Sequence, residues 1–127
     1  MQIVKIEEAT FSYSDAKFTI KERLSGASAR IKDKTMQLRL DLESRGQTIE
    51  TAMELGVLLK IQESLTGWEN VTGEDGKELE CNTAGKKLFC ENLPEAVFKE
   101  FSDKFTAEYD KLIKALTKQR EKAVKNS

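Results

Sequence analysis

An apolar stripe in the last third of the 127-residue sequence constrains the fold more than any other feature. Hydrophobic side chains recur there at steps of three and four over about five turns, the spacing that places them on one face of an α-helix. Pro94 precedes the stripe and suits the first turn of a helix. The stripe predicts one long helix with an apolar face that must be covered, formed by Val97, Phe98, Phe101, Phe105, Tyr109, Leu112, Ile113 and Leu116.

A charged segment over residues 27–44 also fits a helix, and Gly46 is a natural stop after it. The spacing is mixed, because Leu38, Leu40 and Leu42 alternate as they would in a strand. The prediction of a helix here therefore rests partly on residue propensity and on the stop signal.

Two more helices are predicted in the centre of the chain. Residues 49–65 are strongly apolar, with Thr48 as a candidate N-cap and Gly67 as the expected end. Asn82 or Thr83 can cap a shorter helix that precedes Pro94.

Strand signals are confined to two places. Residues 1–22 are rich in β-branched and aromatic types, and Ser14 and Asp15 supply turn chemistry between two expected strands. Residues 67–82 surround Asp75 and Gly76, a pair typical of a tight hairpin turn.

These elements predict a mainly α fold with a small β component. It consists of an N-terminal β-hairpin, a short central hairpin and a long C-terminal helix, and the chain length suits a single domain over residues 1–127. The expected divisions are N-terminal strands over 1–22, helices over 25–66, a hairpin over 67–82, helices over 83–117 and a basic frayed tail over 118–127.

Composition narrows the range of partners. Charged residues make up 34% of the chain but sum to a net charge of −1, so no overall field attracts nucleic acid or anionic lipid. No apolar run approaches the roughly 20 residues that span a bilayer, and the N-terminus lacks the pattern of an export signal. We therefore expect a soluble, cytoplasmic protein in which Cys81 and Cys90 are unpaired.

The usual catalytic residue patterns are missing from the sequence. It has no histidine, the commonest general base and metal ligand. It has no phosphate-binding glycine loop, and its two cysteines lack the spacing and additional ligands of a zinc site. Glu50 and Glu54 would share a helical face, but on so charged a chain such a pair is typical of solvated surface. We expect no enzyme activity, no cofactor and no metal.

The apolar stripe itself allows two interpretations. It is the core face of a packed helix, or it is a seam for oligomerisation or a groove for a partner helix, because a small domain need not cover so long a helix with its own residues. Both can apply along different parts of one helix.

One segment resembles a known family. The segment reads Leu65-Thr66-Gly67-Trp68-Glu69-Asn70-Val71-Thr72-Gly73-Glu74-Asp75-Gly76-Lys77-Glu78-Leu79-Glu80-Cys81-Asn82. We expect a helix to end at its Gly-Trp pair, and a valine-bearing segment then leads to an Asp-Gly turn. A polar strand then enters a helix near Asn or Thr. This order resembles the small tail assembly chaperones of long-tailed bacteriophages of the siphophage type. The upstream Phe18–Leu24 segment is similar to the short strand that opens such proteins.

The resemblance implies a chaperone for virion assembly in the host cell cytoplasm. Such a protein associates with the tape measure protein, keeps it soluble and helps recruit tail tube subunits. Apolar surface on the last helix would then contact the partner, and homo-oligomers are compatible with it. The candidate partner-binding residues are Phe101, Phe105, Tyr109, Leu112 and Leu116.

Two other functions remain open from the sequence. The first is a structural or adaptor protein of the phage particle, which would share the helical core but stay in the assembled virion. The second, less favoured, is a nucleic-acid-binding module that uses the basic residues of 118–127, which have no interleaved aromatic side chains.

Overall fold

The computed structural model describes residues 7–46 and 49–125, without the side chains of 49–55, 123 and 125. Helices dominate, and one small antiparallel sheet accompanies them, which confirms the predicted fold class. The elements in chain order are β1 (Glu8–Tyr13), β2 (Ala16–Lys21), α1 (Ser25–Ser44), α2 (Ile49–Ser64), β3 (Leu65–Glu69), α3 (Thr83–Asn92) and α4 (Glu95–Lys125).

The predicted N-terminal hairpin is confirmed over residues 8–21, and residues 1–6 of the expected strand region lie outside the described residues. Strands β1 and β2 pair from Glu8 opposite Lys21 to Tyr13 opposite Ala16, which leaves Ser14 and Asp15 as the turn. Ser14 adopts a positive φ of 55°, as tight hairpin turns between twisted strands require.

The pairing of a third strand with β2 was not predicted, because residues 67–69 were expected in the first arm of the central hairpin. β3 begins directly where α2 ends, and it pairs with β2 so that the sheet order is β1-β2-β3. Phe18 lies opposite Trp68, and Thr19 lies opposite Gly67. Gly67 is therefore a strand residue three positions beyond the end of the helix, and the expectation that it stops the helix is wrong.

The central hairpin is shorter than the expected 67–82. A bridge pairs Thr72 with Glu78, and the Gly76 N–H donates to the Gly73 carbonyl at 3.0 Å to close the turn. Trp68 belongs to β3 instead, because its strand partner is β2 rather than the returning arm of the hairpin. The long-range pairing of β2 with β3 overrides the local hairpin signal there.

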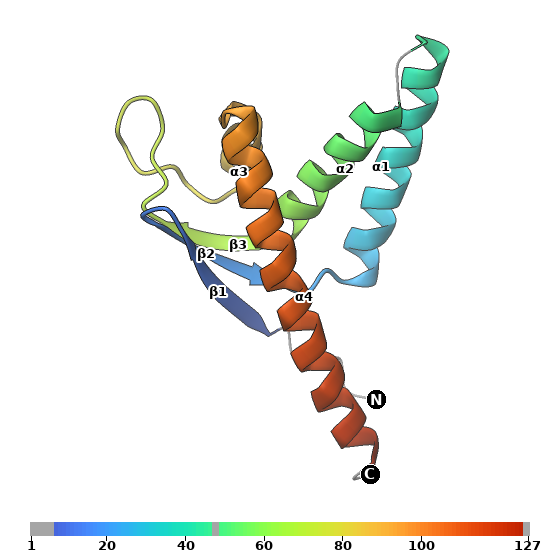
Figure 1. Cartoon of the computed structure of the whole chain (residues 1–127), viewed down its shortest axis with the longest axis vertical. Coiled ribbons are helices and arrows are strands. Elements are labelled where there is room, and N and C mark those ends of the chain that lie inside the picture. Colours follow the sequence, from blue (N-terminus) through green and yellow to red (C-terminus); the bar gives the residue numbers. More distant parts are fainter. Residues whose placement is uncertain (1–6, 47–48, 126–127) are drawn as a thin grey trace.

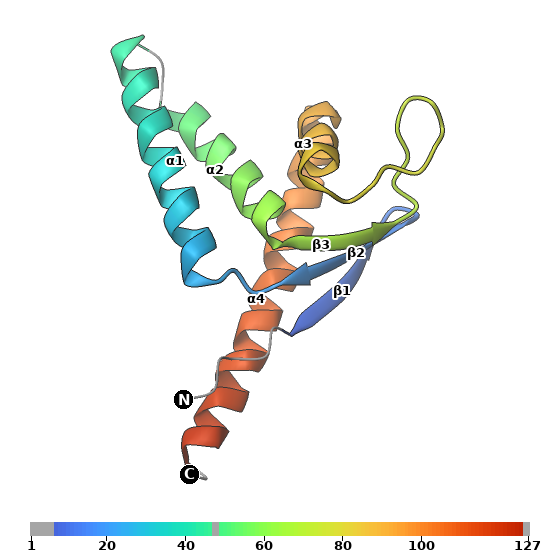
Figure 2. The same ribbon diagram turned by 180° about the vertical axis from the view of Figure 1, so that it is seen from behind.

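Helix α4 crosses the sheet and continues beyond it (Figure 1), and the reverse view shows the strands in front of this helix (Figure 2). The core lies between them. Alternate residues of β2 point inward, so Phe18 and Ile20 are buried, and Phe101 of α4 meets Phe18 at 4.9 Å between ring centroids. Phe89 of α3 packs 5.2 Å from Phe101. This aromatic cluster joins the sheet to both C-terminal helices.

The expected fraying is not what the structure shows over residues 118–125, since α4 continues through Lys125, and residues 126–127 lie outside the described part of the chain. Arg120 is held by Glu22, the residue directly after β2, through two hydrogen bonds, one of them 3.0 Å long. The sequence could not reveal this tertiary ion pair between residues so far apart in the chain.

Helices α1 and α2 form an arm that diverges from α4 in both views (Figures 1 and 2). Gly46, with a φ of 71°, follows α1 and supports the predicted stop. The ambiguous alternation of leucines resolves as a helix in which Leu42 is buried and Leu40 is exposed. The buried residues of α1 lie outside the main core cluster, so the arm is a secondary layer.

The start of α3 depends on a glycine. The Asn82 side chain caps the helix by accepting the Gly85 N–H at 2.8 Å. The backbone turns so tightly here that a Cβ on Gly85 would lie 1.9 Å from the Glu80 carbonyl oxygen. Only a residue without a Cβ fits at this position.

We predict that Gly85→Ala destabilises the protein by about 2–3 kcal/mol, because the Glu80 backbone must move to relieve the overlap. Gly26→Ala is the matched control in α1, where the new Cβ meets only the flexible end of Arg30 at 3.5 Å. That change should leave the free energy of unfolding unchanged or raise it by up to about 1 kcal/mol. Urea unfolding of both variants measures the difference, and equal stabilities would contradict the prediction.

We also predict that the ion pair between Glu22 and Arg120 holds the end of α4 in a pH-dependent way. Hydrogen bonding to Arg120 lowers the pKa of Glu22 below its ordinary value. The pair therefore stabilises the fold at pH values above the unfolded pKa, and this contribution disappears as the pH falls through the lowered pKa. At neutral pH, Glu22→Gln should speed amide exchange in the last turns of α4 roughly two- to fivefold.

The control for this prediction is Glu43→Gln, which removes the exposed pair with Arg39 on α1 and should leave exchange in α4 unchanged. Exchange rates measured by mass spectrometry at neutral and acidic pH test the idea. Identical rates at the end of α4 in Glu22→Gln and wild type at neutral pH would exclude a structural role for the pair.

Candidate protein-binding surfaces

The residues expected to contact a partner are mostly core in this structure. Phe101, Phe105, Leu112 and Leu116 are at most 8% exposed and belong to the main core cluster. Tyr109 packs against that cluster, its hydroxyl accepts the Arg23 backbone N–H at 3.1 Å, and its ring lies 4.0 Å from the Arg23 guanidinium. From Phe101 to Leu116 the stripe is therefore the core face of a packed helix, whereas Phe98, near the start of α4, is only partly buried.

A different apolar surface opens beside it. The α2–α4 groove, as we name it, is a hollow of about 690 Å³ between α2, the end of α3 and the start of α4. Cys90 lies at its floor and is 4% exposed. Apolar side chains form its walls, and charged side chains of both signs form its rim. The walls comprise Val57, Leu58, Leu93 and Phe98. The rim comprises Glu91, Glu95 and Lys99.

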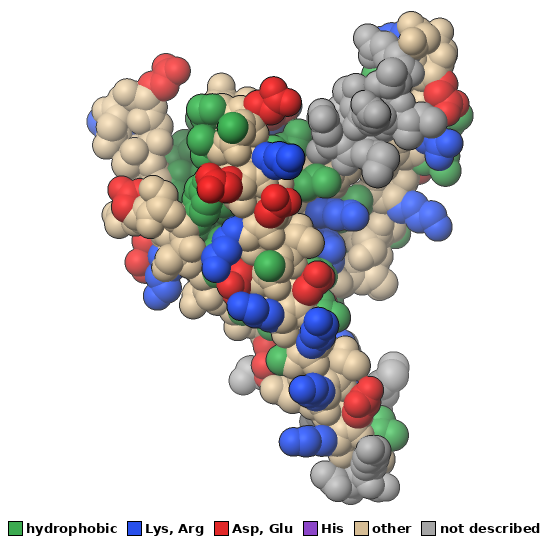
Figure 3. All heavy atoms as spheres, in the orientation of Figure 1, with side chains coloured by type: hydrophobic (Ala, Val, Ile, Leu, Met, Phe, Trp, Pro, Cys, Tyr) green, Lys and Arg blue, Asp and Glu red, His purple; other side chains and the backbone are tan. Residues whose placement is uncertain are grey.

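A second hollow lies on the other side of α3. It measures about 620 Å³ and is bordered by the central hairpin, with Leu79, Leu88 and Phe89 among its apolar residues. Trp68 fixes the hairpin there, because its indole N–H donates to the Leu79 carbonyl at 2.6 Å. Leu93 lines both hollows. Figure 3 shows hydrophobic side chains beside the upper part of α4, whereas charged side chains of both signs dominate its lower part.

Sequence reasoning did not identify α3 and Leu93 as part of a surface. Leu88, Phe89 and Cys90 are consecutive and therefore point to different sides of a short helix, so no single apolar stripe marks them. Leu93 precedes Pro94 and carries only the signal of a chain break. A continuous run of apolar residues in so short a helix was the available clue.

The described residues contain no group of three His, Cys, Asp or Glu side chains placed to hold a metal. Asp75 accepts the Lys77 N–H at 3.1 Å, which agrees with its predicted role in a turn. The side chains of Glu50 and Glu54 lie outside the described residues. Within the described part of the chain, no helix has the length and apolarity needed to cross a bilayer.

Both cysteines are free thiols. Burial is the main reason that the pKa of Cys90 rises to about 12, with a smaller contribution from the nearby Glu91 carboxylate. Burial also raises the pKa of the less buried Cys81, and Lys86 partly opposes that change. A thiol that stays protonated in an apolar floor is a packing residue rather than a nucleophile.

We predict that a thiol-reactive disulfide reagent near neutral pH modifies Cys81 before Cys90, by a factor of at least about 100, because the thiolate is the reactive form. The Cys81→Ser variant isolates Cys90 and allows its rate to be measured by absorbance. In urea the two thiols should react at similar rates. Equal rates in the folded protein would instead show that the groove floor is open to solvent.

Comparison with known proteins does not assign the chain to a family: no protein-family model, curated protein or solved structure matches it.

Proposed function

We propose that this protein is a non-catalytic, protein-binding chaperone that receives an amphipathic helix of its partner in the α2–α4 groove. The observation that carries the proposal is the groove itself, whose walls Val57, Leu58, Leu93 and Phe98 come from two helices and the turn that precedes α4. Grooves of this kind bind the apolar face of a helix, and a rim with both charge signs suits its polar flanks.

Partial burial of the walls supports the same function. Val57, Leu58 and Phe98 also pack against the core cluster, so the groove is held in shape by the fold. Leu93 also lines the groove but does not belong to that cluster. Leu93 can therefore contact a partner with little loss of core packing.

The resemblance to phage tail assembly chaperones supplies the partner class. Of the features that carry it, Gly67 and Trp68 lie in β3 rather than at a helix end, the turn at Gly76 follows, and Asn82 caps α3. On this basis we propose that the partner is a tape measure protein, that tail tube subunits are recruited to the complex, and that the complex forms in the host cell cytoplasm. An adaptor that remains in the virion is the alternative.

The basic end of the chain gives the nucleic-acid alternative little support. Arg120 already pairs with Glu22, and both signs of charge occur along α4, as in the pairs of Lys104 and Lys111 with Glu108. No aromatic ring accompanies the exposed cations after Leu116 for stacking on a base.

We predict that Leu93→Asp weakens capture of the partner at least about tenfold, which corresponds to about 1.4 kcal/mol, because a carboxylate would be desolvated in the groove. Leu40→Asp is the matched control, since Leu40 is 60% exposed on α1 and lines neither hollow. The measurement co-expresses each variant with the products of its neighbouring genes and follows the long helical protein that is insoluble when expressed alone. The soluble fraction of that partner is quantified, and the purified complex is sized by light scattering.

Wild type and Leu40→Asp should keep the partner soluble, whereas Leu93→Asp should not. Equal capture of the partner by both variants would refute the proposal that the groove binds it. Recovery of this chain from purified, finished particles by mass spectrometry would favour the adaptor over the chaperone.

A further inference from the structure

We propose that a separate basic pocket, at the base of the α1–α2 arm, binds an acidic segment of a partner protein. The pocket has a volume of about 400 Å³ and lies between α1 and α2 beside Arg23. Four of its lining residues are cations, and none of the described lining residues is acidic. The cations are Arg23, Lys32, Arg39 and Lys60, and the apolar lining consists of Ile31 and Met36.

Neutral partners hold Arg23 in place while leaving its charge uncompensated. Its guanidinium donates to the Ser64 hydroxyl at 2.9 Å and lies over the Tyr109 ring. Ser64 is fully buried, and its hydroxyl donates in turn to the Lys60 carbonyl at 2.9 Å. The pocket therefore contains one cation fixed by the fold, which lowers the entropy lost when a carboxylate binds there.

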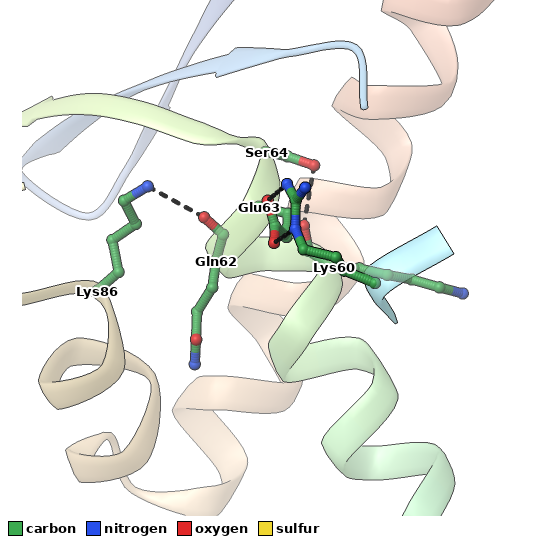
Figure 4. A network of polar contacts seen from close by, with 6 residues as sticks. Lys60, Gln62, Glu63, Ser64 and Lys86 are labelled. Carbon is green, nitrogen blue, oxygen red and sulfur yellow. Dashed lines mark hydrogen bonds and ion pairs between the residues drawn. The ribbon is translucent and has the colours of Figure 1, made fainter. Parts of the chain in front are cut away.

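The two lysines of the pocket add charge that no described side chain neutralises. Among the described residues, neither Lys32 nor Lys60 takes part in an ion pair. Figure 4 shows the Lys60 side chain extending away from the polar network that surrounds Glu63 and Ser64. Glu63 is already engaged by Arg30 through two hydrogen bonds of 3.2 Å. Arg39 is paired with Glu43, which leaves Arg23, Lys32 and Lys60 without a carboxylate partner among the described residues. Like charges gathered in this way favour an anionic ligand.

The apolar lining favours an acidic protein segment over other anions. Met36 is 49% exposed, so a ligand that carries apolar side chains between its carboxylates gains from covering it. The described lining residues include no aromatic ring to stack on a base, and the net charge of −1 gives no general attraction for a phosphate backbone. Charge complementarity and exposed methionine together specify the occupant.

This pocket is distinct from the α2–α4 groove, because the two share no lining residue. The inference therefore does not depend on the proposed chaperone function. A chain with both sites would hold a partner at two points, one by apolar contact and one by charge.

The test uses the full chain and a short fluorescein-labelled peptide of glutamates with interspersed leucines, followed by fluorescence anisotropy at low and physiological salt. We expect Lys32→Glu with Lys60→Glu to weaken binding at least about tenfold. The matched control, Lys87→Glu with Lys114→Glu, changes the net charge equally at exposed positions outside the pocket and should alter binding by less than about threefold. Circular dichroism verifies folding, and Lys32→Gln with Lys60→Gln replaces the first variant if it fails to fold.

Several results would overturn the proposal. Equal losses in the pocket and control variants would indicate a net-charge effect. Tighter, pocket-dependent binding of a single-stranded oligonucleotide would assign the site to nucleic acid, and displacement of the peptide by millimolar inorganic phosphate would assign it to a free anion. No binding of the peptide by wild type at low salt would also refute it. A peptide that binds wild type and the control but not the pocket variant supports the site.

Discussion

The contact between Phe18 and Phe101 is the interaction on which the rest of the structure depends. Their ring centroids lie 4.9 Å apart, and both side chains are fully or almost fully buried. Phe18 also meets Phe11, Phe89 and Trp68, so one ring on β2 contacts β1, α3 and β3 as well as α4. Aromatic side chains remove large apolar areas from water, which explains how so charged a chain is held together by a small cluster.

This cluster divides the molecule into a body and an arm. The body contains the sheet, α3, α4 and the end of α2, whereas the buried residues of α1 lie outside the main core cluster. The α2–α4 groove follows from this division, because α2 diverges from α4 (Figure 1). Apolar side chains of both helices line the hollow between them. The basic pocket lies at the base of the same arm. Both candidate surfaces are thus consequences of one helix pair that the core does not fully enclose.

Local signals predicted most elements, and long-range contacts explain the failures. The hairpin around Ser14, the cap at Asn82 and the long last helix all depend on neighbours within a few residues. Strand β3 depends on β2, which lies more than 40 residues earlier, and no local pattern at Trp68 distinguishes that pairing from a local hairpin. The continuation of α4 past Leu116 was missed for a related reason, since its partner Glu22 is distant in the chain.

The sequence by itself determined which side chains share a face of each helix and that histidine chemistry is absent, because periodicity and composition are properties of the chain alone. Only the tertiary structure decided which of those faces is covered. Phe101 and Leu116 are buried in the core, whereas Leu93 and Met36 line hollows, although all four are apolar residues. The physical reason is that a spacing of three and four fixes the direction of a side chain relative to its own helix, but the element that packs against it comes from elsewhere in the chain.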